Sequence, residues 1–469
     1  MPDRRLFGTS GVRGIVGSEL TLELCRGLGK ALGSTLPEQS TACVATDTRE
    51  SRDRVKEALV SGLLSTGVDV VDLGILPTPA LALFTSRMGF AAGAMITASH
   101  NPPEYNGVKL FDPRPIGYGR DQEVRVEEIY FGGRFRQGSG KLLSRRTTFA
   151  DYFSCVENRL PLSKLNRRLK VVVDPGHGAA SGFATALLRH LGVEVLPLHD
   201  EPDGSFPGRS PEPTPETLEG TLGFLRENRA NLAVCFDGDA DRVVFCDAEG
   251  FLGFNEMIAF VSRFAVAESD KRRVATTVES GRHLELALEG LGAEVVRGKV
   301  GDVNVAHLAQ EMDAALGVEN VGVYVFPELG YYPDTMAAVL QLLGHVQQPG
   351  EIRDFFRGLP TLHFHKRGVR CPDGAKREVM EQVAAYCIKP QEREELRGNS
   401  ICSSLLRKES SVNTLDGLRI ELADSWVLIR PSGTEPVIRV LAESSSEVRA
   451  QELVRDGSQL VAWCMEETE

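Results

Sequence analysis

The sequence lacks any apolar run that could cross a membrane, and its cysteines lack a paired motif. A membrane-spanning helix needs about 18 or more consecutive apolar residues, and none of the 469 residues lies in such a run. Residues 1–8 (MPDRRLFG) also lead into no apolar segment of the kind found in a secretory signal peptide. The nine cysteines are scattered without a C-x-x-C pair, which favours reduced, buried thiols. We therefore expect a soluble, cytoplasmic protein.

Basic residues are in the minority. The chain has 53 Lys and Arg against 65 Asp and Glu, a formal net charge of −12, which excludes broad binding to nucleic acid or to an anionic membrane. A few local arginines and lysines could still hold an anionic small molecule. Low-complexity runs are also absent, and 42% of the residues are hydrophobic, so the chain is expected to fold. Its length is sufficient for several domains.

A pattern of strand, helix, glycine and strand occurs three times, at residues 44–74, 171–198 and 275–296. In each copy a buried strand is followed by an amphipathic stretch, and a glycine then precedes a second strand. This order favours parallel pairing through a right-handed crossover. The sequence therefore predicts three similar α/β domains with mixed sheets.

The last hundred residues have a different pattern. Short strands are expected at residues 413–422, 426–430 and 437–441, with hairpin-like joints, and a terminal helix at 447–466. They indicate a smaller C-terminal α+β domain. The predicted domains span residues 1–150, 151–252, 253–365 and 366–469.

The first candidate site follows the apolar run at 91–96 and reads TASHNPP at residues 97–103. A buried strand ends here, so Ser99 is presented at a strand tip, the edge where ligands of open α/β sheets bind. A plain Asn-Pro turn with a helix cap would have the same sequence. Ser99 becomes a nucleophile only with help from a base or a metal.

The second candidate site reads DGDADR at residues 237–242, directly after an apolar strand. Asp237, Asp239 and Asp241 alternate along the chain, with Gly238 allowing a tight bend, so three carboxylates can converge on one cation. Oxygen ligands alone favour Mg²⁺ or Ca²⁺ over zinc. An EF-hand is excluded because its sixth and twelfth positions hold Arg242 and Ala248. The alternative is an acidic surface turn.

Two further segments could hold phosphate. Residues 430–436 read RPSGTEP, and their backbone N–H groups, two hydroxyls and the guanidinium groups of Arg430 and Arg439 could form an anion cradle. A simple hairpin is the alternative. Residues 8–14 (GTSGVRG) combine three glycines with Arg13 and could approach a phosphate closely. Together with Ser99 and the three aspartates, they supply what phosphoryl transfer needs.

These motifs resemble those of the α-D-phosphohexomutase family. The matching segments are residues 8–14, 97–102, 105–109 (YNGVK), 237–242 and 430–436, which occur in the family's order and span nearly the whole chain. The resemblance implies a heart-shaped enzyme of four domains around a central cleft, a phosphosugar mutase that interconverts 6-phospho and 1-phospho sugars. Its substrate is a small-molecule sugar phosphate, and the expected assembly is a monomer or homodimer.

The resemblance also implies a role for each matching residue. Ser99 carries the phosphoryl group, and Asp237, Asp239 and Asp241 bind one Mg²⁺ ion together with it. The residues that line the reaction centre are Arg13, His100, Lys109 and Arg242. The residues that bind the sugar or its remote phosphate are Glu319, Lys299, Asp302, Arg430, Ser432, Gly433, Thr434 and Arg439.

The implied mechanism exchanges phosphoryl groups. Phosphorylated Ser99 gives its group to the sugar monophosphate, the resulting bisphosphate turns over, and its other phosphate returns to Ser99. A sugar bisphosphate is the expected activator. Lys109, with His100 as a second candidate, is expected to handle the hydroxyl proton, and closure of the fourth domain to exclude water. The alternatives are a phosphatase, which needs no remote cradle, and a non-catalytic sugar-phosphate-binding protein.

The third-domain motif departs from the family pattern. The family commonly has Gly-Glu-x-Ser-Gly-His, whereas residues 317–323 read GVENVGV, with Val321 and Val323 in place of polar residues. The opening segment is most similar to the phosphoglucosamine mutase branch, which makes glucosamine phosphate the first choice of substrate. The two valines predict broad specificity, with glucose and mannose phosphates turned over within about two orders of magnitude. Phosphomannomutase, phosphoglucomutase and phosphopentomutase activities remain alternatives.

Overall fold

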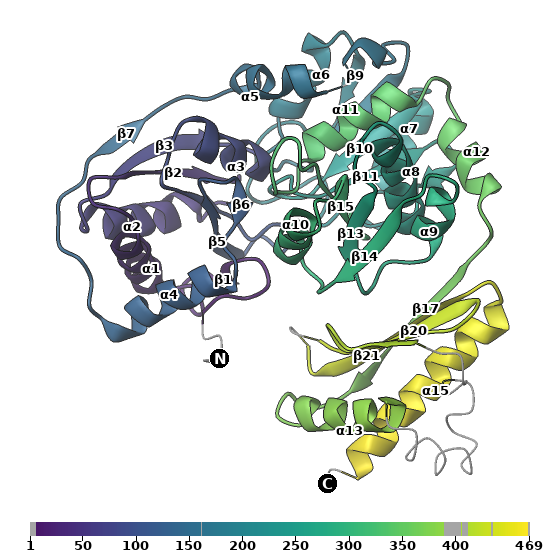
Figure 1. The fold of residues 1–469 in the computed structure, drawn as a ribbon. Coiled ribbons are helices and arrows are strands. Elements are labelled where there is room, and N and C mark those ends of the chain that lie inside the picture. The colour runs from purple at the N-terminus through teal and green to yellow at the C-terminus, as the bar shows by residue number, and fades with distance from the viewer. Residues whose placement is uncertain (1–5, 161, 389–404, 406–410, 433–434, 468–469) are drawn as a thin grey trace. The chain divides into compact units, whose positions relative to one another are not determined.

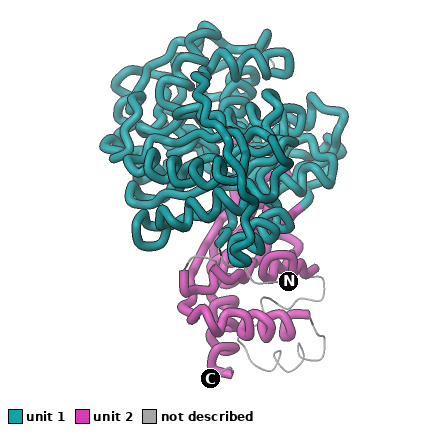
Figure 2. The backbone as a smooth tube through the Cα atoms, turned by 90° about the vertical axis from the view of Figure 1, so that its left-hand side faces the viewer, with its two compact units in different colours: residues 1–276, 287–296, 301–355 teal, residues 277–286, 297–300, 356–469 magenta. Residues whose placement is uncertain are grey.

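The chain divides into two compact units, each described here by itself. A computed structural model describes residues 6–160, 162–388, 405, 411–432 and 435–467 (Figure 1). The first unit comprises residues 1–276, 287–296 and 301–355 (Figure 2). The second comprises residues 277–286, 297–300 and 356–469. Across the described residues, no helix has the length and apolar character that a membrane crossing requires.

The first sheet of the first unit is mixed. Its strands are β1 (Val12–Ile15), β2 (Thr41–Thr46), β3 (Asp69–Ile75), β4 (Ala92–Ile96), β5 (Tyr105–Asp112), β6 (Ile116–Gly117) and β7 (Leu142–Ser144). They lie in the order β1-β5-β4-β2-β3-β7, with β6 paired to β5. The pairs β2–β3, β2–β4 and β3–β7 are parallel, whereas β5 is antiparallel to both β4 and β1. The carboxyl ends of β2 and β4 therefore lie at the same edge.

Helices cover both faces of this sheet. They are α1 (Leu22–Thr35), α2 (Arg52–Leu64), α3 (Thr78–Arg87) and α4 (Arg120–Gly132). The buried side chains of α1 and α2 share one apolar cluster with Ala42 and Val44 of β2. Cys43 lies between them and points to the other face, where its Sγ is 3.4 Å from Thr85 Oγ1 of α3. The two-residue period of a buried strand thus explains the α/β/α layering.

Two further sheets repeat this plan and lie mostly in the first unit, while residues 277–286, 297–300 and 356–358 belong to the second. Their elements are α5 (Phe149–Val156), two short 3₁₀ turns (Glu157–Arg159 and Leu162–Lys164), β8 (Lys170–Asp174), α6 (Phe183–His190), β9 (Glu194–Pro197), α7 (Glu219–Glu227), β10 (Leu232–Phe236), β11 (Val243–Asp247), β12 (Gly250–Phe251), α8 (Phe254–Ala267), β13 (Arg273–Thr277), α9 (His283–Leu288), β14 (Glu294–Gly298), α10 (Asp302–Glu311), β15 (Leu316–Glu319), β16 (Val323–Val325), α11 (Thr335–His345) and α12 (Glu351–Gly358). The strand orders are β12-β11-β10-β8-β9 and β14-β13-β15-β16. β8 is parallel to β9 and β10, and β13 is parallel to β15.

The second unit contains one antiparallel sheet. Its elements are β17 (His363–Arg370), α13 (Lys376–Ile388), β18 (Ser411–Asn413), β19 (Leu418–Glu421), β20 (Ser425–Pro431), β21 (Val437–Ser444) and α15 (Glu447–Glu466). The strand order is β17-β21-β20-β19-β18, and every pair is antiparallel. Apolar residues of α13 and α15 form one core with the sheet.

The predicted fold class is confirmed. There are three α/β/α domains, each with a mixed sheet, and a C-terminal domain with an antiparallel sheet. The terminal helix has the predicted bounds. The segment predicted as one strand at 413–422 is instead a β18–β19 hairpin, because Gly417 adopts φ 87° between the strands. Strand β17 was not predicted, and the boundary placed at residue 365 falls inside it. The eight cysteines within the described residues are all free, and all but Cys155 are buried, as predicted.

Candidate active site

Ser99 lies in a buried turn directly after β4, which we call the serine loop (residues 97–102). Its side chain is almost inaccessible, and its backbone has φ 53°, in the left-handed region that non-glycine residues rarely adopt. Ser99 Oγ donates a hydrogen bond to Asp237 Oδ2 at 2.6 Å and lies 3.4 Å from Asp241 Oδ1. Unusual backbone geometry of this kind is often found at functional sites. The structure thus brings the first two candidate sites together.

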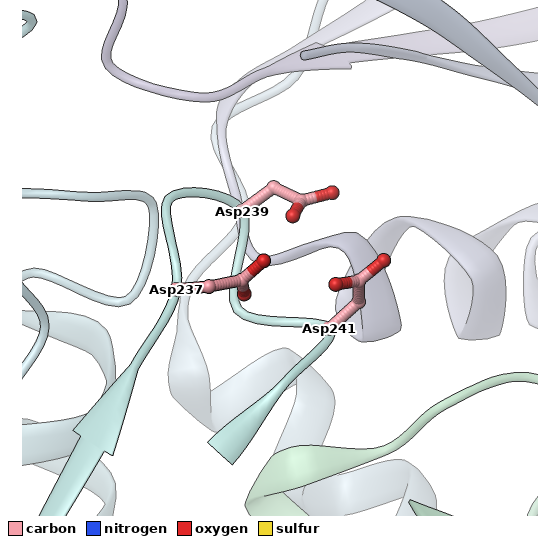
Figure 3. A group of neighbouring side chains, drawn as sticks. All are labelled: Asp237, Asp239 and Asp241. Atoms are coloured by element: carbon pink, nitrogen blue, oxygen red, sulfur yellow. The ribbon is translucent and has the colours of Figure 1, made fainter. Parts of the chain in front are cut away.

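Asp237, Asp239 and Asp241 converge in the loop between β10 and β11, which we call the aspartate loop (residues 237–242; Figure 3). All three are buried, and one carboxylate oxygen from each lies within 4.8 Å of the others. The residue of this loop with positive φ is Ala240, at 59°. A Cβ on Gly238 would lie 2.5 Å from Ser99 O, so glycine is needed there because the two loops touch.

The oxygen atoms of this cluster suit a hard cation. Asp239 Oδ2 accepts a hydrogen bond from Thr78 Oγ1 at 2.6 Å, and Thr78 N donates to Asp239 O at 2.9 Å. Asp239 Oδ1 is buried and has no hydrogen-bond partner among the described residues. A buried carboxylate oxygen without a partner is costly unless a cation contacts it. The residues present therefore fit Mg²⁺, which prefers carboxylate oxygens.

Basic side chains surround the carboxylates. Lys109 Nζ of β5 contacts Asp239 Oδ2 at 2.7 Å and also pairs with Asp241. Burial alone would lower the pKa of Lys109, but the attraction of these two carboxylates raises it above its usual value. Lys109 is therefore charged in this arrangement and acts as a counter-charge. Its role in handling the hydroxyl proton stays a prediction.

Arg242 and Arg13 add two further basic side chains, and His100 lies near them. Burial alone would lower the pKa of Arg242, but Asp241 and Asp237 raise it. Burial and the nearby charges of Arg242, Arg13 and Lys109 lower the pKa of His100 to about 2, so its imidazole is neutral. Arg13 Nη1 donates to Asn101 Oδ1 at 3.1 Å, which ties β1 to the serine loop.

The glycine-rich segment at residues 8–14 packs most closely against the rest of the protein at Gly11. A Cβ on Gly11 would lie 2.3 Å from Val108 O of β5, so this glycine allows close packing of the segment on the sheet. Ser10 Oγ forms a hydrogen bond with Asp302 Oδ1 of α10. The first and third predicted domains therefore meet beside the aspartate loop.

The third-domain motif divides into a polar and an apolar part. Glu319 ends β15, and its Oε1 accepts a hydrogen bond from Gly301 N at 3.1 Å. Val323 is 1% exposed in an apolar cluster with Ile116 and Val305, and Val321 packs against the same cluster. The broad specificity inferred from the two valines stays a prediction, and Val323 lies in this cluster because every residue of the short strand β16 is buried.

The predicted phosphate loop lies in the second unit, as does Lys299. Arg430 is paired with Glu279 at 2.8 Å and with Asp416 at 3.1 Å, and Arg439 with Glu435 at 2.7 Å. Ser432 is buried. Gly433 and Thr434 lie outside the described residues.

The sequence alone did not identify two side chains that support these loops, Lys376 and Thr78. Lys376 Nζ of α13 donates to Ser432 O at 2.7 Å and to Glu435 O at 2.5 Å and also pairs with Asp373 at 2.6 Å, so it fixes the backbone of the phosphate loop. Thr78, at the start of α3, holds Asp239 from 161 positions away. Neither residue lies in a motif, and no sequence signal marked either one.

A buried carboxylate behind the aspartate loop predicts a pH effect. Asp334 accepts hydrogen bonds from Tyr152 Oη and from Ala337 N, capping α11, and the next residue, Thr335, donates through Oγ1 to Ala240 O at 2.7 Å. Burial raises the pKa of Asp334 to about 6. Its unfolded pKa is about 3.9, so its protonated form stabilises the fold fully below that pH. This stabilisation is lost as the pH rises through 6.

The substitution Asp334→Asn keeps the cap and cannot ionise. Relative to wild type, the variant is expected to gain on the order of 1 kcal/mol of stability between pH 5 and pH 7.5. Urea denaturation at the two pH values measures this gain. Asp121→Asn, at an exposed position in α4, is the control and should show no such gain. An equal effect of Asp334→Asn at both pH values would contradict the assignment.

Comparison with known proteins gives four family matches along the chain. Models described as phosphoglucomutase/phosphomannomutase α/β/α domains I, II and III match residues 4–137, 150–250 and 254–360. The model of the C-terminal domain of the same family matches residues 369–457.

Two similar relatives have different names. A protein of Methanopyrus kandleri named "Probable phosphoglucosamine mutase" is 36% identical over 99% of both chains. A protein of Thermococcus kodakarensis named "Phosphoglucomutase/phosphomannomutase" is also 36% identical, over 97% of this chain and 98% of its own. Identity at this level establishes the family and leaves the sugar open.

Solved structures agree with the fold. A phosphoglucomutase/phosphomannomutase family protein of Burkholderia thailandensis has a TM-score of 0.84 at 26% identity, covering 97% of each chain. An Aspergillus fumigatus N-acetylphosphoglucosamine mutase, solved with GlcNAc-6P and magnesium, has a TM-score of 0.54 at 15% identity, over 90% of this chain and 82% of its own. The second likeness concerns the fold alone. The chain belongs to the phosphoglucomutase/phosphomannomutase family and is a phosphohexomutase.

Proposed function

We propose that Ser99 carries a phosphoryl group between two hydroxyls of a hexose phosphate, and that glucosamine phosphate is the preferred substrate. The observation that carries the proposal is the buried Ser99 Oγ, 2.6 Å from Asp237 Oδ2 within a cluster of three carboxylates. A serine in this position can exchange phosphate with a bound sugar because the surrounding charges are fixed before the reaction. The proposed location is the cytoplasm.

Each residue of the site has a proposed task. Asp237, Asp239 and Asp241, with Ser99, would hold one Mg²⁺ ion, which neutralises charge on the transferring group when bound. Lys109, Arg13 and Arg242 would balance the remaining negative charge, and neutral His100 would line the pocket. A sugar bisphosphate would restore phosphate to Ser99 whenever it is lost.

The rest of the substrate would contact two other groups of residues. Glu319, Asp302 and Lys299 would bind sugar hydroxyls. The residues proposed for the remote phosphate are Arg430, Ser432, Gly433, Thr434 and Arg439. Lys376 supports this proposal because it fixes two carbonyl groups of the same loop. A phosphate would have to compete with Glu279 and Asp416 for Arg430.

The sugar is tested by comparing kcat/KM for glucosamine, glucose, mannose and ribose phosphates with a bisphosphate primer. We expect the highest value for glucosamine phosphate and values about 10- to 100-fold lower for glucose and mannose phosphates, the effect of one unmatched hydrogen bond. The substitution Val321→Ser should leave this ranking unchanged and lower the melting temperature, because Val321 packs on an apolar cluster.

A different preferred sugar would contradict the substrate proposal. A higher kcat/KM for glucose or mannose phosphate would instead support the second candidate, a phosphoglucomutase/phosphomannomutase, which the name of the Thermococcus kodakarensis relative favours. A preference for ribose phosphate would contradict both. Absence of turnover with every sugar, together with tight binding, would indicate a non-catalytic binding protein.

A further inference from the structure

A buried arginine holds the backbone of the serine loop in place. Asp47 directly follows β2, and Arg49 Nε pairs with its Oδ2 at 3.0 Å, both side chains being fully buried. The other guanidinium nitrogens of Arg49 donate to backbone oxygen atoms, namely Ser99 O at 2.8 Å, Asn101 O at 2.5 Å, Tyr105 O at 2.9 Å and Pro102 O. One side chain thus fixes four carbonyl groups in and next to the loop that carries Ser99.

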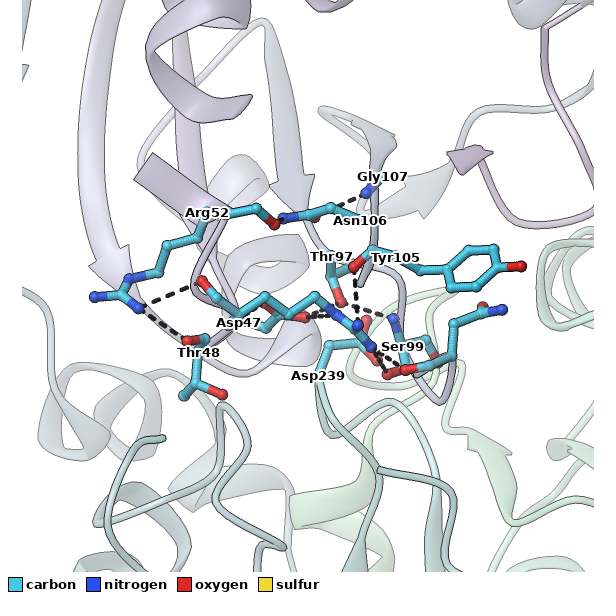
Figure 4. Close-up of polar contacts among 12 residues, drawn as sticks. Asp47, Thr48, Arg52, Thr97, Ser99, Tyr105, Asn106, Gly107 and Asp239 are labelled. Carbon is cyan, nitrogen blue, oxygen red and sulfur yellow. Dashed lines mark hydrogen bonds and ion pairs between the residues drawn. The ribbon is translucent and has the colours of Figure 1, made fainter. Parts of the chain in front are cut away.

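A threonine completes this cluster on the other side of Ser99. Thr97 Oγ1 donates to Asp47 Oδ2 at 2.6 Å and accepts a hydrogen bond from Ser99 N at 2.8 Å (Figure 4). Both backbone polar groups of Ser99 are therefore bound to the Asp47–Arg49 pair or to its threonine. This network is what holds Ser99 at its positive φ.

The second sheet repeats the same arrangement behind the aspartate loop. Asp174 ends β8, and Arg209 Nε pairs with its Oδ2 at 3.0 Å, again with both side chains buried. Arg209 Nη2 donates to Phe236 O at 2.7 Å, directly before Asp237, and Thr221 Oγ1 donates to Asp174 Oδ2 at 2.6 Å. In both sheets, an aspartate at a strand end is therefore paired with an arginine that binds backbone oxygen atoms at the end of the parallel neighbouring strand or in the loop after it.

One segment joins the two arginines. The ring centroid of Phe206 lies 5.4 Å from Arg49 Cζ. A Cβ on Gly204 would lie 2.4 Å from both Thr48 O and Glu50 N, so residues 204–206 pack directly on the backbone around Arg49. Arg209 follows three residues later. The segment thus links the support of the serine loop to that of the aspartate loop.

We propose that Arg49 and Arg209 are a matched pair of positioning residues that set the distance between Ser99 Oγ and the Asp237 carboxylate. This inference rests on the proposed function of Ser99. Neither arginine touches the reacting atoms; Arg49 acts through the backbone of the serine loop, and Arg209 acts through the backbone of the residue directly before Asp237. A misplacement of about 1 Å costs on the order of 100-fold in rate, so loss of either guanidinium should reduce turnover more than binding.

Lysine substitutions test the pair because lysine keeps the charge but not the planar set of five donors. Arg49→Lys and Arg209→Lys should each lower kcat by about 100-fold and change KM by less than about threefold. The matched controls are Arg136→Lys and Arg226→Lys, since Arg136 donates to the backbone oxygen atoms of Gly33, Leu36 and Thr66 and Arg226 donates to Ala248 O, all outside both loops. The controls should keep the kcat of wild type. Wild-type kcat in a folded Arg49→Lys or Arg209→Lys variant would overturn the inference.

If the lysine variants do not fold, two milder substitutions at Thr97 test the inference. Thr97→Val keeps the shape and removes the hydroxyl, and it should lower kcat by about tenfold at unchanged KM. Thr97→Ser restores the hydroxyl and should return kcat to within about threefold of wild type. Equal kcat in the two variants would contradict the inference. Wild-type enzyme without phosphate on Ser99 and without turnover would instead contradict the proposed function, so the two failures are distinguishable.

Discussion

Replacing Ser99 with alanine is expected to lower turnover by about 10⁴-fold or more and to remove covalent phosphate from the purified protein. The reason is that Ser99 Oγ is the hydroxyl placed against Asp237, and alanine leaves the loop intact but removes the acceptor of the phosphoryl group. Intact-mass spectrometry and peptide mapping measure the phosphate, and a coupled assay measures turnover.

A nearby hydroxyl and a control serine show whether this result is specific to Ser99. Thr78 Oγ1 also contacts the cluster, through Asp239, so peptide mapping must show that phosphate is lost and not moved to Thr78. Ser51→Ala is the matched control, because Ser51 Oγ contacts Asn106 and lies in no proposed site. Ser99→Ala protein that retains wild-type turnover would show that Ser99 is not the carrier.

Asp239→Asn is expected to have the next largest effect, a fall in kcat of about a thousandfold together with loss of Mg²⁺ binding. Asp239 Oδ1 is the buried oxygen without a partner among the described residues, so it is the atom most in need of a cation. Asparagine keeps the size of the side chain and removes its charge. Calorimetric titration with Mg²⁺ reports binding independently of turnover, and EDTA should reproduce the loss of activity in wild-type protein.

The control for this change is Asp313→Asn, an exposed aspartate paired with Lys271. It should bind Mg²⁺ and turn over substrate like wild type. Circular dichroism should show an unchanged fold in Asp239→Asn. An unfolded Asp239→Asn protein would show that the aspartate loop is structural. Unchanged Mg²⁺ affinity would show that the metal binds at a different site.

Much of the fold follows from local sequence. Each α/β repeat has a buried strand, an amphipathic helix and a glycine before the next strand, and these signals need no knowledge of distant contacts. Ser99 and Asp237 could also be singled out, because each follows the carboxyl end of a buried strand. That they lie 2.6 Å apart required the structure, since 138 positions separate them.

The supports of the site could not be predicted from the sequence. Arg49 binds carbonyl groups about 50 positions away, and nothing in its neighbouring sequence distinguishes it from a surface arginine. Gly238 was expected to provide a bend, whereas its role depends on the approach of the serine loop. Val323 stands at a position that is polar in the family motif, but its side chain lies in an apolar cluster with Ile116 and Val305, which come from distant parts of the chain.

The most direct test of the account follows the phosphoryl group itself. Enzyme labelled with ³²P on Ser99 would be mixed, in a single turnover, with unlabelled glucosamine phosphate, and the products separated over time. The account predicts that the label leaves Ser99 and enters the sugar as bisphosphate and then monophosphate. Label that stays on Ser99 while the substrate turns over, or that appears only as inorganic phosphate, would contradict it.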